Sequence, residues 1–101
     1  MSQNAQACAL LEFLADGCSA GVIALSEVVV TYGSRSGPNR VAFTAESVQG
    51  RKGRASDPSL EDLAFWLEGF RAGTRRALMV TPLPRKGLGP SEKMTFDIAY
   101  D

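Results

Sequence analysis

The sequence predicts an α+β domain, built from a helix, a β-hairpin and a second helix, with a β-like C-terminal extension. Two segments carry apolar residues at helical spacing, and others alternate apolar with polar residues around glycine- and proline-containing turns. The chain has 101 residues, which is enough for one modest hydrophobic core. We therefore expect a single domain, with a helix-hairpin-helix core over residues 1–76 and an extended or β-like arm over residues 77–101.

The first helix is expected over residues 4–16. Either Ser2 or Asn4 is available as its N-cap, and Gly17 is expected to end it. The apolar side chains of this segment recur every three or four positions, as on one face of a helix: Ala7, Leu10, Leu11 and Leu14.

A β-hairpin is expected next, with turn residues at positions 33–39. Residues 20–26 either lengthen its first strand or form a short helical turn, because periodicity does not separate the two for so short a run. In the first strand, one face is expected to carry Val28, Val30 and Tyr32 and the other Val29 and Thr31. In the second strand, Val41 and Phe43 alternate with Ala42 and Thr44.

The stretch ASDPSLEDLAFWLEGFRAG predicts the second helix. Either Asp57 caps it ahead of Pro58, or Ser59 caps it together with Asp62 in a capping box. Gly73 is expected to end it. Its apolar stripe consists of Leu60, Leu63, Ala64, Leu67 and Phe70, widened by Phe65 and Trp66.

Two further strands are expected in the C-terminal third, over residues 77–80 and over the last alternating segment. The apolar face of that last segment consists of Met94, Phe96, Ile98 and Tyr100. These four residues either complete the sheet of their own chain or form an arm that is donated to the sheet edge of a neighbouring subunit.

The sequence offers little for catalysis. It contains no histidine and only two cysteines, so one chain lacks the residues for a cysteine-histidine metal site or nucleophile. The acidic residues near the start of the second helix are explained by capping, and neither a G-x-S-x-G nor a P-loop pattern occurs. We expect no enzymatic activity, no catalytic residue, no metal and no cofactor.

Charge is balanced over the whole chain, with eleven basic and eleven acidic residues, but it is segregated along the sequence. Residues 1–34 and 57–70 are acidic, whereas residues 35–56 and 71–86 are basic. Faces of opposite charge suit a protein that binds a neighbouring copy head to tail, so we expect a homo-oligomer. No apolar run approaches the roughly 18 residues of a membrane span, and the N-terminus does not resemble a signal peptide. We expect no membrane contact, and a location in the cytoplasm or in an assembly built there.

Seven basic residues are candidate contacts for phosphate or for a partner surface: Arg51, Lys52, Arg54, Arg75, Arg76, Arg85 and Lys86. The first three lie in or beside GRKG, which has the G-x-x-G form of the loop in KH domains. Its flanks do not supply the apolar helices that a KH domain needs. A flexible link that ends in a helix cap is therefore the competing interpretation of this loop.

The order of the expected elements resembles the gpW-like family of bacteriophage head-tail connector proteins. The similarity is carried by ALLEFLADG (residues 9–17), SEVVVTYG (26–33), RVAFTAESV (40–48) and SLEDLAFWLEGF (59–70). It implies a virion structural protein, assembled in the host cytoplasm, that forms an oligomeric ring as an adaptor. The portal and tail components would be its partners. DNA would pass through the ring, and the DNA backbone would contact the protein.

Two other functions stay open at this point. One is a small inhibitory binding protein of the anti-defence kind that phages encode, which would be a monomer or dimer that titrates one protein target. The other is a nucleic-acid-binding module that uses Arg51, Lys52 and Arg54, whose affinity would fall steeply with salt.

Overall fold

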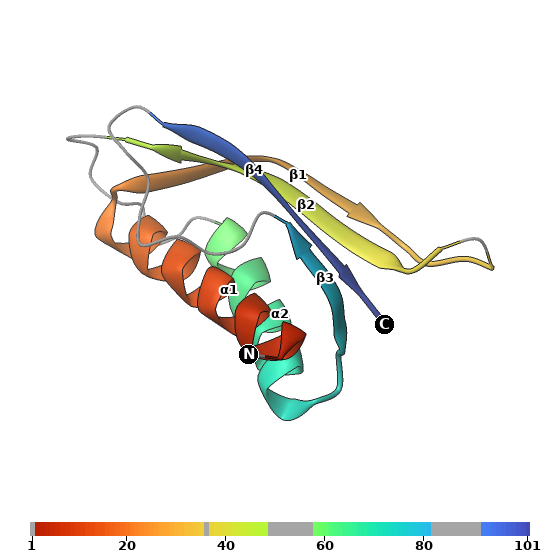
Figure 1. The fold of residues 1–101 in the computed structure, drawn as a ribbon. Helices are drawn as coiled ribbons and strands as arrows, with labels where there is room; N and C mark the ends of the chain where they lie inside the picture. Colours follow the sequence, from red (N-terminus) through yellow and green to blue (C-terminus); the bar gives the residue numbers. More distant parts are fainter. Residues whose placement is uncertain (1, 36, 49–57, 82–91) are drawn as a thin grey trace.

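A computed structural model describes residues 2–35, 37–48, 58–81 and 92–101 of the chain. The elements follow the order α1 (Gln3–Ala20), β1 (Ile23–Thr31), β2 (Asn39–Ser47), α2 (Pro58–Ala72), β3 (Ala77–Thr81) and β4 (Lys93–Tyr100). The four strands form one antiparallel sheet in the order β1-β2-β4-β3, and both helices lie on the same side of it (Figure 1). The predicted α+β class and the helix-hairpin-helix order are confirmed.

Helix α1 begins where the sequence indicates and ends later. The Ser2 hydroxyl accepts a hydrogen bond from the backbone N–H of Ala5 at 3.1 Å, so Ser2 is the N-cap. The predicted end at Gly17 is wrong, because the helix continues to Ala20 and ends at Gly21, whose φ of 75° is left-handed. Gly17 is buried instead, in close contact with the side chain of Ile23.

Strand β1 contains a bulge. Residues Ile23–Ser26 are part of the strand, which decides between the two alternatives for this segment. Ser26 pairs with Thr44 and Val29 with Ala42, so two residues of β1 lie opposite the single residue between them on β2. One of the two is Glu27, whose φ of 54° is rare for a side chain other than glycine. The bulge resets the alternation and leaves Val29 on the sheet face turned away from the helices.

Strand β4 lies in the middle of the sheet, paired with β2 on one side and β3 on the other. Phe96, Ile98 and Tyr100 are buried in the core, and Met94 packs against it. This segment therefore completes the sheet of its own chain, which corrects the interpretation of these four residues as an arm for strand donation. The division at residue 76 is corrected for the same reason, because β3 and β4 belong to the core.

Helix α2 begins at Pro58, which is the first of the two expected starts and places Ser59 inside the helix, and it ends before Gly73, which has a φ of 77°. Leu63, Trp66 and Phe70 are buried, and the rings of Phe70 and Tyr100 meet edge to face with centroids 5.9 Å apart. The buried stripe is narrower than predicted, since Ala64 and Phe65 are exposed. Asp57, the first candidate cap, lies outside the described residues.

Candidate functional site

Five of the seven basic candidates lie outside the described residues: Arg51, Lys52, Arg54, Arg85 and Lys86. The other two are engaged within the chain. The Arg75 guanidinium carbon lies 4.2 Å from the ring centroid of Phe65 and 5.6 Å from that of Tyr100, a cation-π arrangement that joins α2 to β4. Arg76 donates to the Asp101 carboxylate at 2.9 Å. Both arginines thus have internal partners, which the sequence did not reveal.

Four of the eight large apolar side chains that are exposed in the described part of the chain lie at the far end of β1. Val28, Val29 and Val30 are 39%, 57% and 38% exposed, and Tyr32, just beyond the strand, is 83% exposed. We call residues 28–32 the β1 wing. Solvated surfaces tolerate single exposed valines, but a run of this kind on one element is typical of a surface that another molecule covers.

The helices leave the β1 wing uncovered. The β1–β2 hairpin projects past the ends of both helices, to the right in Figure 1. The helix-facing residues of β1 follow this geometry: Ile23 is buried, Leu25 is half-buried, and Val28 and Val30 are exposed. The row that contains Val30 continues into the core through Val41 and Ile98, which are fully buried. The exposed side chain of Val30 is therefore continuous with the buried apolar core.

The β1 wing lies on an edge of the sheet that lacks the usual protection. Natural edge strands are shielded from further pairing by lysines, prolines or inward-pointing charges. Strand β1 contains no lysine, arginine or proline, and Glu27 is its single charged residue. The Glu27 carboxylate accepts a hydrogen bond from the hydroxyl of Thr44 at 3.0 Å, so it is held over the neighbouring strand β2. The bulge at Glu27 is the one edge-disrupting feature of this strand.

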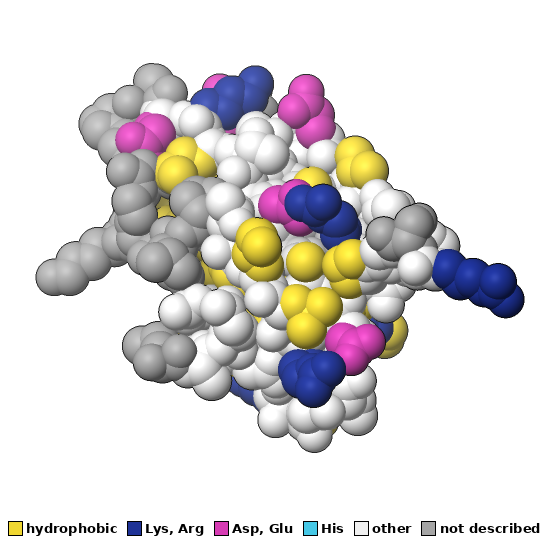
Figure 2. Space-filling view, turned by 45° about the vertical axis from the view of Figure 1, so that its right-hand side comes forward, with side chains coloured by type: hydrophobic (Ala, Val, Ile, Leu, Met, Phe, Trp, Pro, Cys, Tyr) yellow, Lys and Arg dark blue, Asp and Glu magenta, His cyan; other side chains and the backbone are white. Residues whose placement is uncertain are grey.

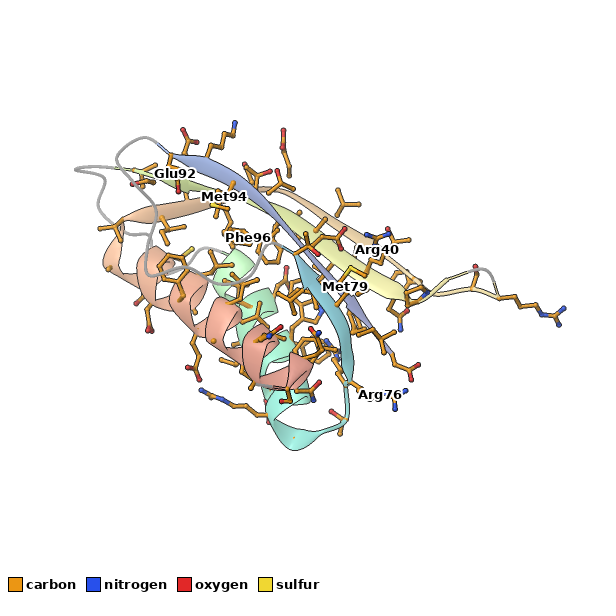
Figure 3. The ribbon with its side chains drawn as sticks, in the orientation of Figure 1. Arg40, Arg76, Met79, Glu92, Met94 and Phe96 are labelled. Atoms are coloured by element: carbon orange, nitrogen blue, oxygen red, sulfur yellow. The ribbon has the colours of Figure 1, made fainter. Side chains whose placement is uncertain are left out.

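The opposite edge, β3, also exposes apolar side chains. Leu78 is 44% exposed and Met79 is 57% exposed. Met79 lies in the same sheet row as Arg40, with Ala99 between them, on the face away from the helices (Figure 3). Arg40 pairs with Asp97 on this face at 2.6 Å. Figure 2 shows hydrophobic side chains gathered around paired basic and acidic side chains in the middle of the molecule.

The electrostatics of this surface are simple. The Asp97 carboxylate accepts hydrogen bonds from Arg40 and raises the pKa of the Arg40 guanidinium, which stays charged. Within the described part of the chain, no three His, Cys, Asp or Glu side chains are grouped so that they could hold a metal ion. The geometry offers an exposed hydrophobic surface with an ion pair beside it.

The sequence pattern predicted the strand but did not predict that the apolar side chains at its far end are exposed. The available signal was the run VVVTY, which contains no charged residue or proline. The exposure of this run depends on the strand order and on the bulge at Glu27, which the sequence pattern does not specify. None of the described helices is long and apolar enough to cross a membrane. No family model, curated protein or solved structure matches the chain.

Proposed function

We propose that this chain is a non-enzymatic assembly subunit that binds a neighbouring protein through the β1 wing. The observation that carries the proposal is the exposed apolar edge of β1. A strand at a sheet edge presents backbone N–H and C=O groups to a further strand, and its side chains supply the apolar contact. Val28, Val29 and Val30 provide both at one place.

The energetics favour association through this surface. Burial of a valine side chain contributes about 1.5–3 kcal/mol when the whole side chain leaves water, and less here because each is already partly covered. Association costs translational and rotational freedom and also the ordering of loops and side chains. The ordering part of that cost is small for the β1 wing, since pairing with β2 already fixes its backbone and valine has few rotamers.

The specific assembly that we propose is a ring-shaped head-tail connector of a phage virion. Its support is the resemblance to gpW-like proteins in the order α1, β1, β2, α2, together with the segregation of charge along the chain. The portal and tail components are the proposed partners on either side of the ring, and the virion is the proposed location. A small inhibitory binding protein would use the same edge to capture one strand of a different protein, at fixed stoichiometry.

Native mass spectrometry over a range of concentrations tests the proposal, with V29K as the disrupting variant. A lysine at this position supplies the charge with which natural edge strands avoid pairing. V22K is the matched control, because Val22 is also exposed but lies before β1, outside the wing. Circular dichroism would show that both variants fold.

The wild type and V22K are expected to form discrete oligomers, alone or on addition of portal, and V29K is expected to remain monomeric. A wild type that stays monomeric at every concentration and with portal present would contradict the connector proposal. Loss of oligomers in V22K as well as V29K would show that the β1 wing is not the binding surface.

A further inference from the structure

We infer that the β1 wing of one copy pairs with strand β3 of the next copy, so that subunits join head to tail into one continuous sheet. This inference rests on the proposed function and names the partner surface. Among the described strands, β1 and β3 are the two edges of the sheet. Each edge exposes apolar side chains, the valines on β1 and Leu78 and Met79 on β3.

Strand direction permits this pairing. Neighbouring strands are antiparallel throughout the order β1-β2-β4-β3, so β1 and β3 run in opposite directions. A second copy placed beside the first in the same orientation therefore brings its β1 antiparallel to β3. The helices of both copies then lie on one side of the extended sheet, as they do within a single chain (Figure 1). Head-to-tail contacts of this kind close into a ring when the rotation between copies allows it.

One register matches the faces of the two strands. Val29 and Met79 both lie on the face away from the helices, and each is 57% exposed. When these two residues lie opposite one another, Val28 faces Val80 on the helix side. Glu27 then lies opposite Thr81, which is uncharged. A slip of the register by one residue would set Val29 against Val80, which is buried on the other face of the sheet. Side chains alternate between the two faces along a strand, so this shifted register would place an outward-facing residue opposite an inward-facing one and is disfavoured.

The alternative is pairing of β1 with β1 of a second copy about a twofold axis. That arrangement also matches faces when Val29 lies opposite Val29 of the second copy. It leaves Leu78 and Met79 exposed, however, whereas head-to-tail pairing covers the apolar side chains of both edges. Coverage of both edges is the reason that we favour β3 as the partner.

Thiol crosslinking distinguishes the two arrangements, with V29C and M79C in the full-length chain. Directly opposed residues of antiparallel strands have Cβ atoms about 4.5–5.5 Å apart, within reach of a short thiol-specific crosslinker. We expect V29C mixed with M79C to give covalent dimers, and the double variant V29C/M79C to give a ladder of higher species. The treated wild type is the control for the native cysteines, of which Cys18 is buried and Cys8 half-buried.

A charge pair gives a second measurement that does not depend on thiols. V29K and M79E should each weaken assembly, and the double variant V29K/M79E should restore it, because opposite charges then face one another across the contact. Under twofold β1 pairing, M79E would leave assembly unchanged.

Each outcome has one meaning. Crosslinks between V29C and M79C, with rescue by the charge pair, support head-to-tail pairing. Oligomers in which V29C crosslinks only to itself overturn the inference and leave the proposed function intact. Oligomers without either crosslink and without rescue also overturn it. Absence of any oligomer, with portal present, overturns the proposed function itself.

Discussion

The side chain of Asn4 accepts a hydrogen bond from the backbone N–H of Ala77 at 2.7 Å, and so joins the first turn of α1 to the first residue of β3. Its amide nitrogen lies 3.3 Å from the carbonyl oxygen of Phe70 and 3.2 Å from that of Arg75, and donates to both. One half-buried side chain thus connects both helices with the β3 edge. This edge is the one that we assign to the neighbouring copy.

Replacement of Asn4 by alanine is expected to destabilise the fold by about 1–3 kcal/mol, because it leaves a partly buried N–H and two carbonyl groups without this partner. Urea denaturation measures the change in the free energy of unfolding. Q3A is the matched control, since Gln3 is exposed in the same helical turn. Equal stability of N4A and Q3A would show that water replaces the Asn4 side chain without cost.

Gly17 is expected to be required by packing rather than by backbone freedom. A Cβ atom at this position would lie 2.6 Å from Cγ1 of Ile23, which is too close for any real contact. We expect G17A to destabilise the protein by about 1–3 kcal/mol, the usual cost of overpacking a core.

The destabilisation caused by G17A should be smaller in a variant that also shortens Ile23. Alanine is favoured over glycine in a helix by up to about 1 kcal/mol, and I23A removes Cγ1 and Cδ1 of Ile23 and leaves only Cβ, 3.0 Å from the added methyl group. G17A should therefore cost much less stability in the I23A variant than in the wild type. A double-mutant cycle of thermal or urea unfolding measures this coupling. Additive effects of G17A and I23A would contradict the packing explanation.

The bulge at Glu27 leads to a prediction about backbone strain. A left-handed conformation costs an ordinary residue about 1–2 kcal/mol, asparagine tolerates it better, and β-branched residues tolerate it poorly. We therefore expect the melting temperature to fall more for E27V than for E27N. S26V is the control, because Ser26 precedes the bulge on the same exposed strand. Similar melting temperatures of E27V and S26V would argue against a strained bulge.

The sequence predicted the elements well because their signals are local. The leucine spacing in α1, the Pro58 start of α2 and the alternation in β4 all depend on residues within a few positions of one another. The end of α1 was misplaced because Gly17 and Gly21 carry the same local signal. Packing against Ile23, a tertiary contact, explains why Gly17 is inside the helix.

The exposed apolar surface could not be predicted from local sequence patterns. Alternation specifies which side chains of a strand share a face, but it does not specify which strand lies beside which. The central place of β4 makes Met94, Phe96, Ile98 and Tyr100 part of the core, and it leaves β1 and β3 as edges. The exposure of Val29 follows from that order together with the bulge at Glu27, and neither is specified by the local pattern. The sequence therefore directed attention to the arginines instead.

The ion pair between Arg40 and Asp97 leads to a prediction about pH and salt. The carboxylate raises the pKa of Arg40 above its already very alkaline ordinary value. A group whose folded-state pKa is raised contributes fully below its unfolded-state pKa, and the contribution is lost only as the pH rises through the folded-state value. The effect of R40Q on stability should therefore be the same at about pH 6 and about pH 9.

Salt concentration, unlike pH, should change the contribution of this ion pair to stability. Both side chains are accessible to solvent, at 54% and 31%, so mobile ions screen their attraction. We expect R40Q to destabilise the protein slightly in low salt, by less than N4A does, and the difference from wild type to shrink in high salt. Urea denaturation at two pH values and two salt concentrations measures all four conditions. The loss of stability caused by R40Q could instead grow between neutral and alkaline pH. A group other than this guanidinium would then have to change its protonation in this range and interact with the ion pair. The description of the pair as two residues alone would be wrong.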